Sequence, residues 1–221
     1  LRRQRQMCIR DRNKMNQVTD QQIIEILRKE AVPALGCTEP VACALACAKC
    51  KEVLGGVPER LDVLVSGNIY KNGMGVGIPG TGMVGLPIAA ALGAVCGKSE
   101  YGLEVLKDVN VGDNLQRAKD LLSHVTVSLK MDAPDKLYAE ALASKGNDKV
   151  KVIIAHTHTN IILVEKNGEE LFKREFKLDT TKKEDKGPEL SVKRIWDFVH
   201  EVDVKDIEFV LQGAEMNKAI S

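Results

Sequence analysis

Four of the six cysteines lie in one Ala-rich stretch, PALGCTEPVACALACAKC, at residues 33–50. Cysteine thiolates act as nucleophiles, bases and metal ligands, so this stretch could carry chemistry. Cys37 precedes a predicted helix whose N-cap we expect to be Thr38, and the N–H groups and dipole at a helix N-terminus lower a thiol's pKa. We therefore predict Cys37 as a reactive thiol, with a buried thiol beside the cap as the alternative.

The other three cysteines of this stretch, Cys43, Cys47 and Cys50, follow at i, i+4 and i+7 and share one face of the predicted helix. Thiolate ligands of iron-sulfur clusters usually come from loops with spacings such as C-x2-C-x2-C, which lets several sulfurs converge. Free cysteine is also a small, well-buried residue that packs closely beside alanine. This spacing favours packing over ligation.

A glycine-rich loop follows the predicted strand RLDVLVSG. Gly75, Gly77 and Gly80 match a dinucleotide-binding pattern formally, but Pro79 interrupts it and no βαβ unit follows. The exposed backbone N–H groups of this loop and one lysine ammonium could bind a small carboxylate. Alternatively, the glycines serve only to form tight turns and to allow close helix packing. The candidate substrate-binding residues are Ser66, Asn68, Lys71, Asn72, Gly80, Thr81 and Gly82.

The segment HTHTN, residues 156–160, ends a predicted strand. At period two His156 and His158 would point to one face, where they could act as acid and base or bind a metal, alone or with Cys37. Two histidines alone are too few ligands for a metal site. A solvated strand end is the alternative.

Composition excludes several classes of function. The 221 residues are 44% hydrophobic, 29% charged and 4% aromatic, with a net charge of +1, so we expect no nucleic-acid surface. No apolar stretch is long enough to cross a membrane, and no secretory signal is evident, so we expect a soluble cytoplasmic protein. The start, LRRQRQMCIRDR, resembles a translated sequencing adapter. We therefore expect residues 1–14 to be a non-native leader, which removes Cys8 and puts the native start near Met15.

The pattern of elements predicts an α+β fold. Helices are expected over residues 20–32, 39–54, 86–95, 103–106 and 113–122, with the glycine-rich loop between the second and third. Residues 124–180 alternate like an antiparallel β subdomain, in which Asn167-Gly168 is a hairpin signal. A charged connector at 180–188 then leads to two C-terminal helices.

Together the segments VPALGCTEPVA, SGNIYKNGMGVGIPGTGMVGLPIAAALG and AHTHTNI resemble the iron-sulfur L-cysteine desulfidase family, relatives of the alpha chain of bacterial iron-sulfur L-serine dehydratase. The resemblance covers the chain from about Val18 onward. It implies a lyase that uses a 4Fe-4S cluster to remove sulfide from L-cysteine, giving pyruvate and ammonia. It also implies that Cys37 is the base or an exchangeable cluster ligand, and that residues 66–72 bind the carboxylate.

One departure from the family is large. Its three cluster-ligating cysteines lie in a further helical domain, and this chain has no cysteine after Cys96. We therefore expect residues 15–221 to be the N-terminal part of such an enzyme, inactive alone and without a cluster. L-serine dehydration is the alternative reaction, and a regulatory module that binds a small amino acid without catalysis is the alternative of another class. The expected partner is a small-molecule substrate, with no nucleic acid and no membrane, and a homodimer is left open.

Overall fold

The computed structural model describes residues 18–34, 36–174 and 190–220. The chain divides into two compact units, Leu1–Pro33 with Leu178–Ser221, and Ala34–Lys177. The expected leader at 1–14, with Cys8, the expected start at Met15 and the connector at 180–188 lie outside the described residues.

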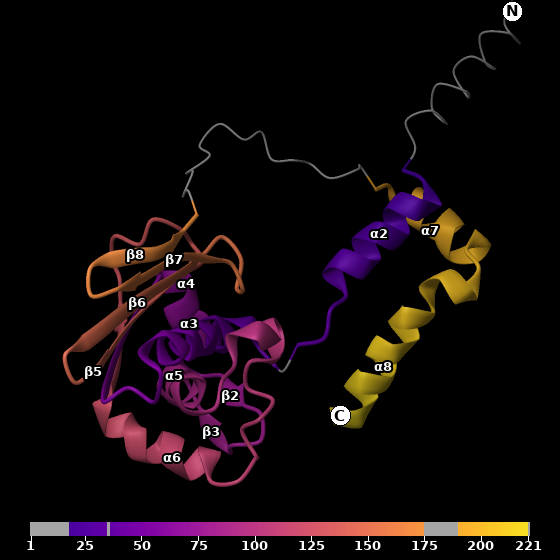
Figure 1. Ribbon diagram of the computed structural model, residues 1–221. Coiled ribbons are helices and arrows are strands. Elements are labelled where there is room, and N and C mark those ends of the chain that lie inside the picture. Colours follow the sequence, from indigo (N-terminus) through magenta and orange to yellow (C-terminus); the bar gives the residue numbers. More distant parts are fainter. Residues whose placement is uncertain (1–17, 35, 175–189, 221) are drawn as a thin grey trace, which may run out of the picture. The chain divides into compact units, whose positions relative to one another are not determined.

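Helices α2 (Asp20–Glu30), α7 (Val192–Glu201) and α8 (Glu208–Ile220), with the 3₁₀ turn η3 (Val204–Ile207), form the described part of the smaller unit (Figure 1). Thr19 and Gln22 make a capping box at the start of α2. The small core of this unit consists of Val18, Ile23, Ile24 and Phe198.

A six-stranded mixed sheet in the order β4-β1-β5-β6-β7-β8 organises the larger unit (Figure 1). Its strands are β1 (Arg60–Val65), β4 (Val125–Leu129), β5 (Tyr138–Lys145), β6 (Asp148–Ala155), β7 (Ile161–Lys166) and β8 (Glu169–Lys173). Strands β5 to β8 are antiparallel neighbours, and Asn167 and Gly168, both with positive φ, form the predicted hairpin turn. Together with the helices, this sheet confirms the α+β fold.

Helices cover one face of this sheet. Helix α3 (Thr38–Leu54) packs against β5 and β6, and α5 (Leu86–Val95) packs beside α3 and contacts β4 (Figure 1). Helix α6 (Asn114–Leu121) lies against α5. The side chains of α3 are mostly alanine and cysteine and are buried on nearly all sides of the helix, as expected for a helix in the core. Its Cys43, Cys47 and Cys50 side chains are 0% exposed, which confirms the packing interpretation.

Gly93 sets the closeness of α3 and α5. A Cβ atom added at Gly93 would collide with the backbone carbonyl of Ala44 on α3. Only glycine lets the two backbones approach this closely, so this contact sets the spacing between α3 and α5.

The sequence predicted an antiparallel subdomain at 124–180, and β4 departs from it. Val63 of β1 pairs in parallel with Val127 of β4, while β1 pairs with β5 in the antiparallel sense. The crossover from β1 to β4 runs through α5 and α6, which are long enough to return the chain in the same direction. The strands of residues 124–173 therefore share one sheet with β1 rather than forming a sheet of their own.

Helix α4 (Gly67–Gly73) lies where the sequence predicted a loop. Glycine and asparagine residues suggested turns, but Ile69 is 1% exposed and packs into the core. Tertiary packing thus overrides weak helix propensity over this short segment. The rest of the glycine-rich stretch contains β2 (Gly77–Ile78) and β3 (Met83–Val84), a two-stranded hairpin.

The 3₁₀ turns η1 (Ser99–Glu104) and η2 (Leu122–His124) complete the described elements. A helix was predicted at residues 103–106, and the structure has η1 ending at Glu104 instead. Among the described residues no helix combines the length and apolar character needed to cross a membrane.

Candidate functional site

The N-terminus of α3 brings a thiol and a carboxylate together. Cys37 itself is the N-cap, not Thr38 as predicted, and its side chain makes no capping hydrogen bond. Instead the Cys37 thiol donates to Glu39 Oε2 at 2.7 Å. The Thr38 hydroxyl lies 3.2 Å from His158 Nε2. This first turn therefore presents three polar side chains next to one another.

Glu39 is the centre of this cluster. The Asn72 amide, at the end of α4, donates to Glu39 Oε1 at 3.2 Å, so each carboxylate oxygen has a side-chain donor. Burial alone would raise the pKa of Glu39. The hydrogen bonds from Cys37, from its own backbone N–H and from Asn72, together with the charge of His158, outweigh that effect and lower this pKa. Glu39 is thus a carboxylate near neutral pH.

The Cys37 thiol is not activated in the way the sequence predicted. Burial, followed by the hydrogen bond to Glu39 and the negative charge of that residue, raises the pKa of Cys37 above its ordinary value. Backbone N–H groups of the first turn favour the thiolate, but they contribute less. The resting pair is therefore a protonated thiol hydrogen-bonded to an ionised carboxylate.

The two predicted histidines separate. Strand β6 ends at Ala155, and His156 takes a positive φ of 70°, so the period-two geometry assumed for the pair does not exist. His156 Nδ1 lies 2.8 Å from Asp135 Oδ2, whereas His158 turns toward Thr38. Burial lowers the pKa of His158, and the charge of Glu39 offsets only part of this shift. His158 is thus a neutral imidazole near neutral pH.

The glycine-rich segment does lie beside Cys37. A Cβ atom at Gly36 would come within 3.1 Å of the Pro79 ring, so the Gly36 backbone lies close to this ring. The Thr81 hydroxyl donates to the Ile78 carbonyl at 2.7 Å and closes the β2–β3 turn. The positive φ angles of Gly80 and Gly82 belong to the same turn. The structure thus gives Gly80, Thr81 and Gly82 a role in shaping the turn, and substrate binding by them stays a prediction.

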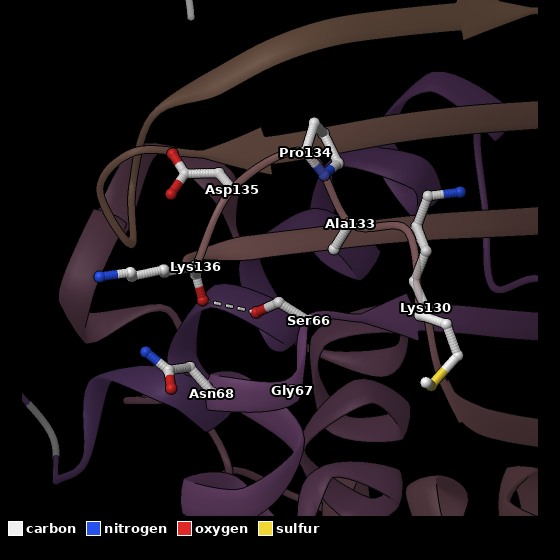
Figure 2. Close-up of a pocket in the computed structure, with 9 residues that line it drawn as sticks. Ser66, Gly67, Asn68, Lys130, Ala133, Pro134, Asp135 and Lys136 are labelled. Atoms are coloured by element: carbon white, nitrogen blue, oxygen red, sulfur yellow. Dashed lines mark hydrogen bonds between the residues drawn. The ribbon is translucent and has the colours of Figure 1, made fainter. Parts of the chain in front are cut away.

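Ser66 and Asn68 line a pocket of about 370 Å³ between the start of α4 and residues 130–136 (Figure 2). Ser66 is 2% exposed, and its hydroxyl donates to the Lys136 carbonyl at 2.7 Å. That hydroxyl is therefore already used in holding the pocket wall. Asn68 is exposed at the rim. Lys71 is also exposed but is not among the residues that line this pocket.

The remaining cysteines do not form a metal centre within the described residues. Burial raises the pKa of Cys43 to about 12, and the Cys50 thiol lies 3.6 Å from the Ala141 carbonyl. Across residues 18–34, 36–174 and 190–220, no group of three or more His, Cys, Asp or Glu side chains is placed to hold a metal ion. These residues do not by themselves fit a 4Fe-4S cluster.

Comparison with known proteins finds relatives that are named UPF0597 protein. The one from Parabacteroides distasonis is 48% identical over 207 residues, which cover 92% of this chain and 48% of the relative. Relatives from Phocaeicola vulgatus and Aeromonas hydrophila are 46% and 44% identical and cover 90% of this chain and 46% of their own length. The chain spans about half the length of the curated relatives it matches. Their name states no activity. No family model and no solved structure matches.

Sequence reasoning missed two residues that the geometry brings forward. Glu39 stands within the Gly-Cys-Thr-Glu-Pro segment, and its place two residues after the cysteine was the available signal. Lys136 belongs to a loop far from the glycine-rich segment in sequence, and only the pairing of β1 with β5 places it beside Ser66.

Proposed function

We propose that this chain supplies the proton-transfer part of a site for α,β-elimination from L-cysteine, with L-serine as the alternative substrate. The observation that carries the proposal is the 2.7 Å hydrogen bond between the Cys37 thiol and the Glu39 carboxylate. The resemblance to iron-sulfur cysteine desulfidases supports the reaction class. A positioned acid–base pair typically contributes about 10²–10⁴-fold to a proton-transfer step.

The pair can move one proton without leaving a charge on sulfur. Glu39 accepts the thiol proton while the Cys37 sulfur accepts the proton on the substrate α-carbon, so the net change is a protonated Glu39. The electron pair of the broken C–H bond forms the Cα=Cβ double bond. The C–S bond breaks, and the sulfur leaves with its electrons as hydrosulfide. The aminoacrylate product tautomerises to an imine, which water hydrolyses to pyruvate and ammonia.

The neighbouring side chains support this role. The Asn72 amide donates a hydrogen bond to one Glu39 oxygen, and the other Glu39 oxygen accepts the hydrogen bond from the Cys37 thiol. Thr38 holds His158, a neutral imidazole that offers a second proton-transfer group next to the pair. The 4Fe-4S cluster implied by the resemblance stays an expectation for a longer protein, and the steps above involve only side chains of this chain.

The test is an anaerobic assay of the gene product extended to the length of the relatives, supplied with L-cysteine or L-serine. Pyruvate formed together with sulfide supports cysteine elimination, and pyruvate from L-serine alone supports the dehydratase. Binding of either amino acid with no pyruvate from both would overturn the proposal in favour of the binding module. The Cys43→Ala variant, altered only in the buried core, serves as the matched control for cysteine loss.

A further inference from the structure

The pocket beside Ser66 is lined by two lysines, Lys130 and Lys136. The Lys136 side chain is exposed, and within the described residues it makes no ion pair or hydrogen bond. Lys130, the other lysine of this pocket, lies 3.5 Å from buried Glu140 and is neutralised by it. Lys136 is therefore the ammonium available to an anionic group that enters the pocket.

The wall that carries Lys136 is held firmly. Its backbone carbonyl accepts the Ser66 hydroxyl, and the Tyr138 carbonyl accepts the Ser66 N–H at 2.9 Å. The next side chain, Asp135, lies 2.8 Å from His156 and accepts the Leu137 N–H at 3.2 Å. Because Asp135 is engaged in this way, it forms no ion pair with Lys136. A neutral amide stands across the pocket, since Asn68 likewise has no hydrogen-bond partner within the described residues.

These two donors face the same space. Figure 2 shows Lys136 and Asn68 extending in the same direction from either side of the hydrogen bond between Ser66 and Lys136. An ammonium and an amide N–H₂ are donors suited to the two oxygens of a carboxylate. A pocket of about 370 Å³ is large enough for a small amino acid.

Two connections join this pocket to the cluster around Cys37. Asn68 and Asn72 are four residues apart on α4, so they lie on one face with Cβ atoms about 6 Å apart. Asn72 in turn holds Glu39. The loop after β6 provides the second connection, because His156 contacts the Asp135 wall and His158 contacts Thr38.

We infer that Lys136 and Asn68 bind the α-carboxylate of an amino acid whose α-carbon is directed along α4 toward Cys37 and Glu39. This inference rests on the proposed function for its orientation, and it names the α-carboxylate of a small α-amino acid as the group recognised. The cation in this inference is Lys136 and not Lys71, the lysine expected from the sequence, because Lys71 does not line this pocket.

The test is NMR titration of the ¹⁵N-labelled chain with L-alanine, which has no β leaving group, and with L-alaninamide, which lacks the carboxylate. We expect L-alanine to shift the Asn68 side-chain and Lys136 backbone signals, and L-alaninamide to leave them in place. Lys136→Met should weaken L-alanine binding by about five- to tenfold, the loss expected for one charge-assisted hydrogen bond at a partly exposed site. The control Lys119→Met, an exposed lysine on α6, should leave binding unchanged.

Equal binding of L-alaninamide, equal affinity of the Lys136→Met variant, or no binding of L-alanine to the unaltered chain would each overturn the inference. The outcome is separable from that of the proposed function, because L-alanine binding needs no turnover. If the protein binds L-alanine through its carboxylate but forms no pyruvate, the proposed carboxylate subsite is supported and the proposed lyase activity is refuted.

Discussion

The Cys37 thiol donates a hydrogen bond to the Glu39 carboxylate across 2.7 Å at the first turn of α3. Burial, and then the hydrogen bond to Glu39 and its negative charge, raise the pKa of Cys37, while the donors to Glu39 lower the pKa of that carboxyl. A thiol at a helix N-terminus usually has a lowered pKa, and here burial and then the neighbouring carboxylate raise the pKa of Cys37 instead. The pair is suited to passing a proton rather than to keeping a permanent thiolate.

Glu39→Gln should make Cys37 more reactive. The substitution removes the negative charge and the carboxylate acceptor, both of which raise the pKa of Cys37. The pKa of Cys37 should therefore fall, and a larger fraction of the thiol is then ionised at pH 8. We expect the rate of iodoacetamide labelling of Cys37 at pH 8 to rise several-fold. In both proteins the rate should increase with pH, and the variant should reach its plateau at lower pH.

Peptide-level mass spectrometry reads Cys37 separately from the other cysteines, and buried Cys47 in the same sample controls for unfolding. A labelling rate that is unchanged or slower in Glu39→Gln, with Cys47 still protected, would show that Glu39 does not hold the thiol proton.

Gly93→Ala should destabilise the larger unit. The added methyl group would collide with the Ala44 carbonyl on α3, and neither backbone can move without disturbing the contact of α3 with the sheet. Overpacking of this kind costs about 1–3 kcal/mol, and backbone collisions fall at the upper end. Urea unfolding followed by circular dichroism measures the change in the free energy of unfolding.

Gly75→Ala is the matched control, since a Cβ atom at Gly75 meets no atom within 4 Å and its φ is not positive. Its free energy of unfolding should stay within about 0.5 kcal/mol of the unaltered protein. Equal stability of the two variants would mean that α3 and α5 are not in the close contact described here.

Much of the fold follows from local patterns, because helix caps and alternation act over a few residues. Helix α2 begins at Asp20, where the sequence predicts a helix start, and Asn167-Gly168 closes the predicted hairpin. The departures arise from tertiary contacts. Burial of Ile69 makes α4 helical despite its glycine and asparagine residues, and the crossover through α5 and α6 makes β4 parallel to β1.

The sequence was enough to predict Cys37 as a candidate site residue, but not the residues that contact it. Cys37 stands out by position, but its thiol pKa depends on Glu39, whose effect is opposite to that of the helix. The spacing of His156 and His158 predicted that both side chains lie on one face of a strand, but the positive φ of His156 turns the backbone there. Lys136 comes from a loop that only sheet pairing brings to Ser66. Such relationships depend on chain topology, which spacing in one segment does not encode.

The most direct test of the proton-transfer pair, Cys37 and Glu39, is the kcat for pyruvate formation by the protein extended to the length of its relatives. Cys37→Ala and Glu39→Gln should each reduce kcat by about 10²-fold or more, since each removes one member of the proton-transfer pair. Cys47→Ala, which shortens a fully buried side chain, should keep kcat within a few-fold. Wild-type kcat in either Cys37→Ala or Glu39→Gln would contradict the account.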